Sequence, residues 1–497
     1  MLDPARTPVI VGVGQVSDRT EDPAAALDPV GLMAAALRDA DVDAGGGWLA
    51  RVGSLAVVDQ ISFRALNPVV DAVADALGMT PAHRVQTPGP MGDSPVRLLA
   101  EAANRIRSGA ATVCAVVGGE ALRTAARRAA LAAGGSAADH NAMRGRHRER
   151  APDYRQRYGL VAPVDVYPLY ENATRAAWGQ TLAEAQAESA AMWAHFSRVA
   201  ADNPAAWLRT PRTADEIATP APTNRPIAFP YLKLMVANIA VNQGAGFIVT
   251  SLAEARARGV ADHAIVHVGL SAAAHESDDV MARDRFDASA GMRVSLEQTL
   301  RRNGVTIGEI DRVELYSCFP CVPKMARRIL GWPLDRAGSV VGGLTFGGGP
   351  IGNYMSHAVA AMVLAQRAEG GTGLLFGNGG FATHNHSILL SSDPIAAAET
   401  ADDFDCQALA DAARNAAPPV DEAYAGAARI ETYTVFYDRE GAARQGVVVA
   451  RNDAGARFLA VVREKDAVRV LTSGDAEPVG MQGIAVRGAD GLVEWGF

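Results

Sequence analysis

The sequence GGLTFGGGPIGNYMSH, residues 342–357, joins a glycine-rich run to the apolar segment AVAAMVLAQ at 358–366. Glycine is used where the backbone must adopt a positive φ or approach another group closely, so this run predicts a tight loop that leads into a helix. Such loops expose backbone N–H groups and favour oxyanions or phosphates. A plain turn between a strand and a helix is the alternative, and the rest of the chain decides between the two.

Length and composition set the first limits. The chain has 497 residues, of which 49% are hydrophobic and 21% charged, as is typical of a globular protein with two or three domains. A net charge of −8 argues against a general nucleic-acid binder. The N-terminus lacks the pattern of a signal peptide, and no apolar run is long enough to cross a bilayer. We therefore expect a cytoplasmic protein without membrane insertion.

Cysteine is scarce, with Cys114, Cys318, Cys321 and Cys406 as its four positions. These are too few and too scattered for a disulfide framework. Cys318 and Cys321 form a CFPC pair that could indicate redox or metal chemistry, but no second pair or nearby histidine cluster completes a zinc site. We expect no bound metal and no bound cofactor.

Apolar strand-like runs alternate with helical segments along most of the chain. In the helix predicted at 94–109, Ser94 can cap the N-terminus and Gly109 can end the helix. The alternation predicts a largely parallel sheet with helices on its faces. It is interrupted between about residues 122 and 232 and then starts again, so that the two halves repeat one order of elements.

Two segments depart from this α/β pattern. The insertion at about 122–232 contains a basic loop that could bind a phosphorylated ligand, although a solvated face with ion pairs is the alternative. The loop's candidate ligands are Arg144, Arg146 and Arg148. Residues 393–428 have the composition of a linker, and 429–497 show the alternating β-branched runs of a small β-barrel. That domain is not basic, so a nucleic-acid-binding barrel is not supported.

This order of elements resembles the thiolase superfamily, whose α/β fold has two βαβαβαββ halves in five α-β-α-β-α layers. The likeness spans about residues 5–392. It is greatest to sterol-carrier-protein thiolases and to thiolase-like proteins of type 1, which carry an extra C-terminal β domain. The resemblance implies halves at 1–258 and 259–392, an insertion that covers coenzyme A, and an OB-like barrel at 429–497.

Catalysis in that family depends on four motifs, and the first two are altered here. The nucleophilic cysteine of the first motif corresponds to Gly92, or in another register to Met91. Ser94 lies nearby as a tentative nucleophile, but it has no adjacent base, and capping explains it as well. The second motif forms an oxyanion hole and here reads Tyr-Ser-Cys-Phe at 316–319. Tyr316 replaces a histidine and could still donate a hydrogen bond or a proton, beside Cys318 and Phe319.

The third and fourth motifs have also lost their catalytic side chains. The third, Gly-His-Pro-x-Gly, reads GGPIG here, with Gly348 and Gly352 at its ends and Gly349 in place of the histidine. Tyr354 and His357 follow in the helix, where a packing role explains His357 more simply than catalysis does. In the fourth motif, GNGG at 377–380, Asn378 replaces a cysteine.

The resemblance implies a protein of the acetyl-CoA acetyltransferase type that binds CoA or an acyl-CoA in lipid, fatty-acid or sterol metabolism. With its Cys/His/Cys set replaced, ordinary thiolase activity is expected to be weak or absent. One alternative is an aldolase-type C–C lyase acting on a β-hydroxyacyl-CoA through Tyr316, Tyr354 and the N–H groups of Gly348 and Gly349. The other is a non-catalytic acyl-CoA carrier or partner-binding scaffold. A homodimer is implied, or a monomer if the extra domain blocks dimerisation.

Overall fold

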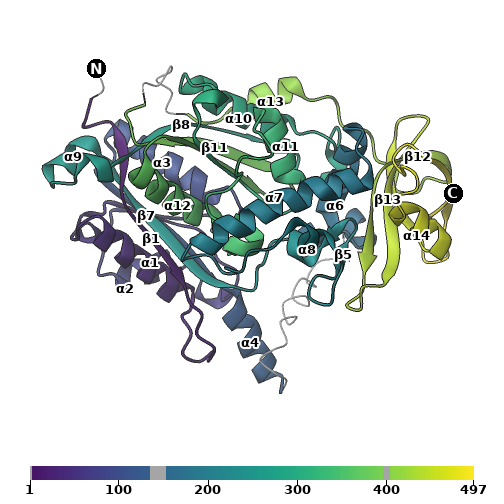
Figure 1. Ribbon diagram of the computed structural model, residues 1–497, viewed down its shortest axis with the longest axis horizontal. Helices are drawn as coiled ribbons and strands as arrows, with labels where there is room; N and C mark the ends of the chain where they lie inside the picture. Colours follow the sequence, from purple (N-terminus) through teal and green to yellow (C-terminus); the bar gives the residue numbers. More distant parts are fainter. Residues whose placement is uncertain (1–2, 135–152, 396–402) are drawn as a thin grey trace.

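A nine-stranded sheet forms the frame of the molecule (Figure 1). The computed structural model describes residues 3–134, 153–395 and 403–497. The first half supplies β1 (Pro8–Ser17), β2 (Ser54–Val57), β3 (His83–Gln86), β4 (Val113–Ala121) and β7 (Asn242–Ser251). The second half supplies β8 (Val266–His275), β9 (Arg312–Leu315), β10 (Thr372–Gly379) and β11 (His384–Ser391). The strand order β3-β2-β4-β7-β1-β8-β11-β10-β9 places the two halves side by side with the same internal order, mirrored about the β1–β8 contact.

Helices lie between the two halves of this sheet and on their outer faces. They are α1 (Pro29–Asp43), α2 (Val70–Ala76), α3 (Ser94–Ser108), α9 (Leu252–Ala257), α10 (Ala290–Arg302), α11 (Cys321–Leu330) and α12 (Tyr354–Glu369). The helices α3 and α12 contact strands of both halves and lie between them, whereas α1 and α2 cover the first half and α10 and α11 the second. The five-layer α/β fold expected from the sequence is therefore confirmed.

The second half has one strand fewer than the first in the part of the chain described. Where a counterpart of β3 would lie, the Leu315 N–H donates to the Gly338 carbonyl at 2.9 Å, and a π-helical turn follows at Gly343–Gly347. Gly342 has a φ of +108°, and a Cβ there would lie 2.5 Å from the Cβ of Ala200 on α7 (Leu182–Asp202). Close contact with α7 thus accounts for the tight turn in this place.

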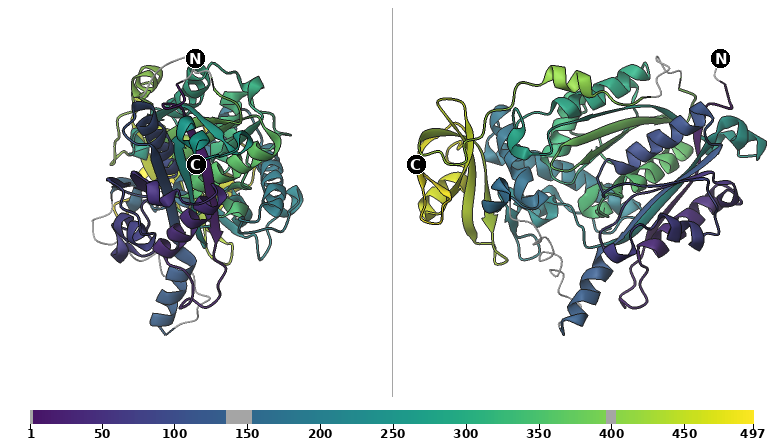
Figure 2. Two further views of the ribbon diagram at one scale, coloured as in Figure 1. Left: turned by 90° about the vertical axis from the view of Figure 1, so that its left-hand side faces the viewer. Right: turned by 180° about the vertical axis from the view of Figure 1, so that it is seen from behind.

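The C-terminal domain lies at one end of the molecule, next to part of the insertion (Figure 2). Besides α7, the insertion contains α4 (Leu122–Ala132), α5 (Tyr154–Arg157), α6 (Pro163–Ala177), α8 (Ala214–Ala218), β5 (Pro226–Ala228) and β6 (Tyr231–Leu232). The helix α6 lies between the nine-stranded sheet and the C-terminal domain, α7 runs across the body, and α4 projects from it (Figures 1 and 2). Between the halves and this domain, α13 (Gln407–Ala413) packs on β8 and α10.

The C-terminal domain is a closed barrel with one helix. Its elements are β12 (Gly426–Tyr437), β13 (Ala443–Asn452), β14 (Arg457–Val462), α14 (Lys465–Thr472), β15 (Gln482–Arg487) and β16 (Val493–Gly496). The strands close in the order β12-β13-β14-β16-β15 and return to β12. The strand β12 also pairs with β5 through Phe436 and Ala228, so the insertion adds two strands to the barrel's sheet. Throughout the described ranges, no helix is both long and apolar enough to span a bilayer.

Candidate functional site

The first, second and fourth motifs meet at Gly92. A Cβ at this position would lie 2.1 Å from the Asn378 carbonyl oxygen and 2.4 Å from the Tyr316 hydroxyl oxygen. The ring of Tyr316 and the backbone of β10 therefore take the space that a cysteine side chain would need. Glycine is required here by packing, and the structure brings together the three motif positions that the sequence pointed to.

Asp93 adds a buried carboxyl to this site, although no sequence motif pointed to it. The residue is only 4% exposed, and its Oδ1 has no hydrogen-bond partner among the described residues. Gly379 makes room for this oxygen, since a Cβ on that glycine would lie 2.8 Å from it. Burial raises the pKa of Asp93, and the nearby His384 and His275 oppose that rise.

Two histidines face each other next to Asp93. His275 and His384 are opposite each other on the antiparallel strands β8 and β11, with ring centroids 4.5 Å apart. The Nε2 of His384 lies 3.2 Å from Oδ1 of Asp278, an exposed residue, whereas Nδ1 of His275 is buried without a partner in the described chain. Burial lowers the pKa of His275. His384 thus links the histidine pair to the exposed Asp278.

The two tyrosines that the sequence proposed as acids differ in their surroundings. Tyr316 and Tyr354 pack edge to face with centroids 5.9 Å apart. The Tyr354 hydroxyl donates to Oε1 of Glu314 at 2.8 Å, and the other carboxyl oxygen accepts from the Ser339 hydroxyl and from the N–H groups of Val340 and Val341. Burial raises the pKa of Glu314 to about 7. The Tyr354 hydroxyl is thus held in a buried hydrogen bond, whereas the Tyr316 hydroxyl faces Gly92.

The glycine-rich loop keeps its polar groups for internal bonds. The N–H of Gly349 donates to the Asn238 carbonyl at 2.8 Å, and those of Gly342 and Gly343 donate to the Ser339 hydroxyl. Gln243 donates from Nε2 to the Gly347 carbonyl at 2.9 Å. The expectation that this loop offers free N–H groups to an anion is therefore wrong for Gly342, Gly343 and Gly349.

The remaining residues of the third motif are set by packing. Gly348 has a φ of +105°, and a Cβ there would lie 2.1 Å from Oε1 of Gln243, while one on Gly352 would lie 2.6 Å from the Cβ of Pro90. His357 is buried on α12 with Nδ1 2.9 Å from Oε1 of Gln15. Burial lowers the pKa of His357 to about 3, so the ring is neutral and packed, as the sequence suggested.

An aromatic side chain from the insertion fills the space between the second and fourth motifs. Tyr167 on α6 stacks on Phe319 with a centroid distance of 4.5 Å. Its hydroxyl accepts from the Ala382 N–H at 2.9 Å and donates to the Gly380 carbonyl at 3.2 Å. Cys318 lies beside it, and burial raises the pKa of this thiol to about 12. We call Tyr167 and Tyr316 the tyrosine plug, because they fill the site in front of the motif loops.

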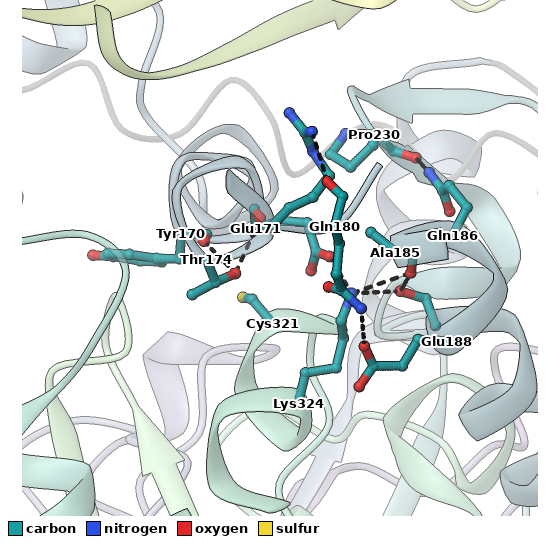
Figure 3. Close-up of polar contacts among 12 residues, drawn as sticks. Tyr170, Glu171, Thr174, Gln180, Ala185, Gln186, Glu188, Pro230, Cys321 and Lys324 are labelled. Atoms are coloured by element: carbon teal, nitrogen blue, oxygen red, sulfur yellow. Dashed lines mark hydrogen bonds and ion pairs between the residues drawn. The ribbon is translucent and has the colours of Figure 1, made fainter. Parts of the chain in front are cut away.

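A buried ion pair holds α11, which follows the second motif, against the insertion (Figure 3). The Nζ of Lys324 contacts Oε1 of Glu171 and donates to the Ala185 carbonyl at 3.2 Å and the Ser189 hydroxyl at 3.1 Å. The Tyr231 hydroxyl donates to the second oxygen of Glu171 at 3.0 Å. Lys324 and Glu171 are both fully buried. No local sequence pattern pointed to this pair, because its members are distant in the chain.

Two further predicted site features can be placed. Ser94 is the first residue of α3, so Asp93 and not Ser94 holds the N-cap position; the Ser94 hydroxyl accepts from the Met91 N–H at 3.3 Å. Its predicted capping role is therefore wrong by one residue. Arg144, Arg146 and Arg148, proposed to bind CoA, lie outside the residues that the structure describes.

Solved structures of known proteins share the fold of this chain. A human mitochondrial 3-ketoacyl-CoA thiolase in complex with CoA matches with a TM-score of 0.60 at 13% identity, over 78% of this chain and 99% of that one. An aldolase described as Ltp2–ChsH2(DUF35) matches with a TM-score of 0.56 at 17% identity, over 78% and 98% of the two chains. The protein thus has the fold of the thiolase superfamily, and the unmatched remainder leaves room for an additional domain.

A more similar structure and a family model identify the group within that class. A monomeric SCP2-thiolase-like protein type 1 from Mycobacterium smegmatis is 30% identical, with a TM-score of 0.83 and complete coverage of both chains. The model for the additional C-terminal domain of thiolase-like protein type 1 matches residues 408–491. No curated protein matches the sequence. The chain belongs to the SCP2-thiolase-like proteins of type 1.

Proposed function

We propose that this protein binds a CoA thioester beside the motif loops and does not carry an acyl group on its own side chains. The observation that carries the proposal is the position of the Tyr316 hydroxyl, in the space where a nucleophile at position 92 would stand. Covalent acyl transfer needs an activated nucleophile. Burial raises the pKa of Cys318 to about 12 and that of Cys114 to about 11, so these thiols stay protonated and unreactive.

Apolar surface near the glycine-rich loop supports a thioester ligand. Met91 and Ile239 are large apolar residues with exposed fractions of 38% and 49%. Each is the neighbour of a residue that touches the loop, since Pro90 meets Gly352 and the Asn238 carbonyl accepts from Gly349. Structures of related thiolases contain CoA, which supports the same ligand class here. By its likeness to the monomeric relative, we also propose that the chain is a monomer.

Calorimetric titration with CoA and with medium- and long-chain acyl-CoAs tests the binding. We expect submillimolar affinity for acyl-CoA and, by intact-mass spectrometry, no acyl adduct on the protein. Ile239→Asp should weaken acyl-CoA binding at least tenfold, because it places a charge on the apolar surface. Val42→Asp, at an exposed position on α1, serves as the matched control and should leave binding unchanged. An acyl adduct, or no binding of any CoA compound, would contradict the proposal.

A second candidate, C–C bond cleavage of a β-hydroxyacyl-CoA, is favoured by the acid and base groups around Tyr316. Retro-aldol cleavage needs a base for the β-hydroxyl proton and an acid for the resulting enolate, but no thiolate. Asp93 has a buried, unpaired carboxyl oxygen beside Tyr316, whereas the Tyr354 hydroxyl is already bonded to Glu314. The structural likeness to an aldolase points in the same direction.

Turnover of a β-hydroxyacyl-CoA separates this candidate from a non-catalytic carrier. Tyr316→Phe and Asp93→Asn should each slow cleavage at least tenfold while acyl-CoA binding persists. Cleavage that is unchanged in both variants would end the lyase hypothesis. Tight binding without any turnover would favour the carrier.

A further inference from the structure

A buried arginine of the barrel bonds to residues outside its own domain. Arg457, the first residue of β14, is 0% exposed. Its Nη1 donates to the carbonyl oxygens of Met281, at 2.8 Å, and of Arg283. Its Nε and Nη2 donate to the two carboxyl oxygens of Glu431 on β12, at 2.8 and 2.6 Å. A planar guanidinium can serve both sets of acceptors at once. The barrel carboxylate therefore orients an arginine that holds the backbone of residues 281–283.

The side chain of Arg283 continues from this backbone to the turn between β10 and β11. Its Nη1 donates to the carbonyl oxygens of Ala382 at 3.0 Å and of Phe381 at 3.4 Å. This turn directly follows the fourth motif at 377–380. Hydrogen bonds therefore connect the barrel with the motif site in two steps, and both steps pass through Arg283.

The charge of Arg283 is unusual for a buried position. The residue is 3% exposed, and it forms no ion pair within the described part of the chain. Its guanidinium carbon lies 4.8 Å from the ring centroid of Tyr170. A buried charge normally has a charged partner, because leaving water costs free energy. The groups that compensate this cost here are an aromatic face and the carbonyl oxygens of the β10–β11 turn.

The turn that Arg283 holds has a strained backbone. Ala382 has a φ of +57° and is the one residue other than glycine with a positive φ in the described ranges. An alanine keeps this conformation only where its surroundings impose it. Its carbonyl accepts from Arg283, and its N–H donates to the Tyr167 hydroxyl at 2.9 Å. The Tyr170 hydroxyl donates to the neighbouring Phe381 carbonyl at 2.7 Å. Side chains from elsewhere in the chain therefore determine the shape of this turn.

We propose that Arg457 is a positioning residue of the motif site, which gives the C-terminal domain a role in that site. Arg457 fixes Arg283, and Arg283 holds the β10–β11 turn in the conformation that places the fourth motif against Gly92. When this turn loosens, the Asn378 backbone and the partner of the Tyr167 hydroxyl move with it. The effect on thioester binding rests on the proposed function, whereas the positioning of the turn does not.

Hydrogen exchange of the full chain without ligand, followed by mass spectrometry, tests the positioning. Arg457→Lys keeps the charge opposite Glu431, but a single ammonium cannot replace the planar fork of donors. We expect the peptide at 380–384 to exchange at least fivefold faster, while β13 in the barrel stays protected. Arg463→Lys is the matched control, because Arg463 directly follows β14 and forms its ion pairs at the surface, with a side chain 39% exposed. Unchanged exchange at 380–384 in Arg457→Lys would overturn the proposal.

A second variant and a double variant test whether Arg457 acts through Arg283. Arg283→Lys leaves the barrel intact, so it tests the link to the turn even where Arg457→Lys does not fold. It should speed exchange at 380–384 at least as much as Arg457→Lys does. The double variant should exchange no more than about twofold faster than Arg283→Lys alone, because both residues belong to one path. Unchanged exchange in Arg283→Lys, or effects that multiply in the double variant, would overturn the proposal.

Acyl-CoA titration of the same proteins measures the consequence for the site. Arg457→Lys and Arg283→Lys should each weaken binding at least fivefold, and Arg463→Lys should leave it unchanged. Unchanged affinity in a variant whose turn exchanges faster would contradict the role of the turn in the site. If the wild type binds no CoA compound, the thioester proposal fails, and the exchange experiments still decide on the positioning.

Discussion

The helix α6 contacts the rest of the molecule at two places, through aromatic packing at one and through charged groups at the other. Near its start, Tyr167 fills the space between two motif loops, and its hydroxyl has partners on the β10–β11 turn. Near its end, Arg175 pairs with Glu477 and donates to the Tyr433 hydroxyl of the C-terminal domain. Stacked aromatic rings fill the first place, whereas an ion pair holds the second. The same helix therefore fills the motif site and contacts the C-terminal domain.

Breaking the ion pair that holds α6 should disturb both places at once and have the largest effect. In Lys324→Met, Glu171 keeps a buried charge without its partner, and we expect a loss of about 3–5 kcal/mol in the free energy of unfolding. Denaturant unfolding measures this loss.

A double variant controls for lost packing around Lys324. Glu171→Gln combined with Lys324→Met removes both charges but keeps an acceptor for the Tyr231 hydroxyl, so it should recover part of the stability. A loss below about 1 kcal/mol in the single variant would mean that the pair is not sealed from water as the structure shows.

Crowding the tyrosine plug should affect the motif site and leave the contact between α6 and the barrel unchanged. Gly92→Ala puts a Cβ within 2.1 Å of the Asn378 carbonyl oxygen, and we expect a loss of about 1–3 kcal/mol in stability. At Gly53 the nearest atom would be 3.9 Å from a new Cβ, so Gly53→Ala is the matched control and should change stability by less than about 1 kcal/mol.

A second substitution at Gly92 tests the same packing. Gly92→Cys, which restores the family's nucleophile, should give no acyl adduct because Tyr316 and the Asn378 backbone occupy the space. An active, stable Gly92→Cys protein would contradict the packing described here.

The sequence was sufficient for the fold because its signals are local and repeated. The glycine-rich run before α12 and the alternation of strands and helices identified both halves. The motif positions Gly92, Tyr316 and Asn378 could be matched one by one. The left-handed Gly109 ends α3 as predicted, with a φ of +74°. Each of these features needs only neighbouring residues in the chain to be recognised.

The contents of the site depend on tertiary contacts that no local pattern contains. Tyr167 comes from the insertion, more than 200 residues before the turn that its hydroxyl binds. Asp93 looked like an ordinary residue before a helix, and only its burial beside His275 and His384 makes it notable. The pairing of β5 with β12 likewise joins segments that the sequence assigned to separate domains.

The smallest effect on stability is expected from the titration of Glu314, which accepts the hydrogen bond of Tyr354. Burial raises the pKa of Glu314 to about 7 in the folded protein, whereas an unfolded glutamate titrates near 4.5. The folded state therefore binds the proton more tightly, and this contribution to stability is present below about pH 4.5 and lost as the pH rises through 7. Glu314→Gln cannot titrate, so its stability should fall less than that of the wild type between pH 5 and 8. We expect a difference on the order of 1–2 kcal/mol across this range, measured by denaturant unfolding.

Glu120, whose pKa burial also raises to about 7, and His357, whose pKa is lowered to about 3, are present in both proteins, so their effects cancel in the comparison. Parallel pH profiles would show that Glu314 stays ionised, and that the bond from Tyr354 is made to a carboxylate.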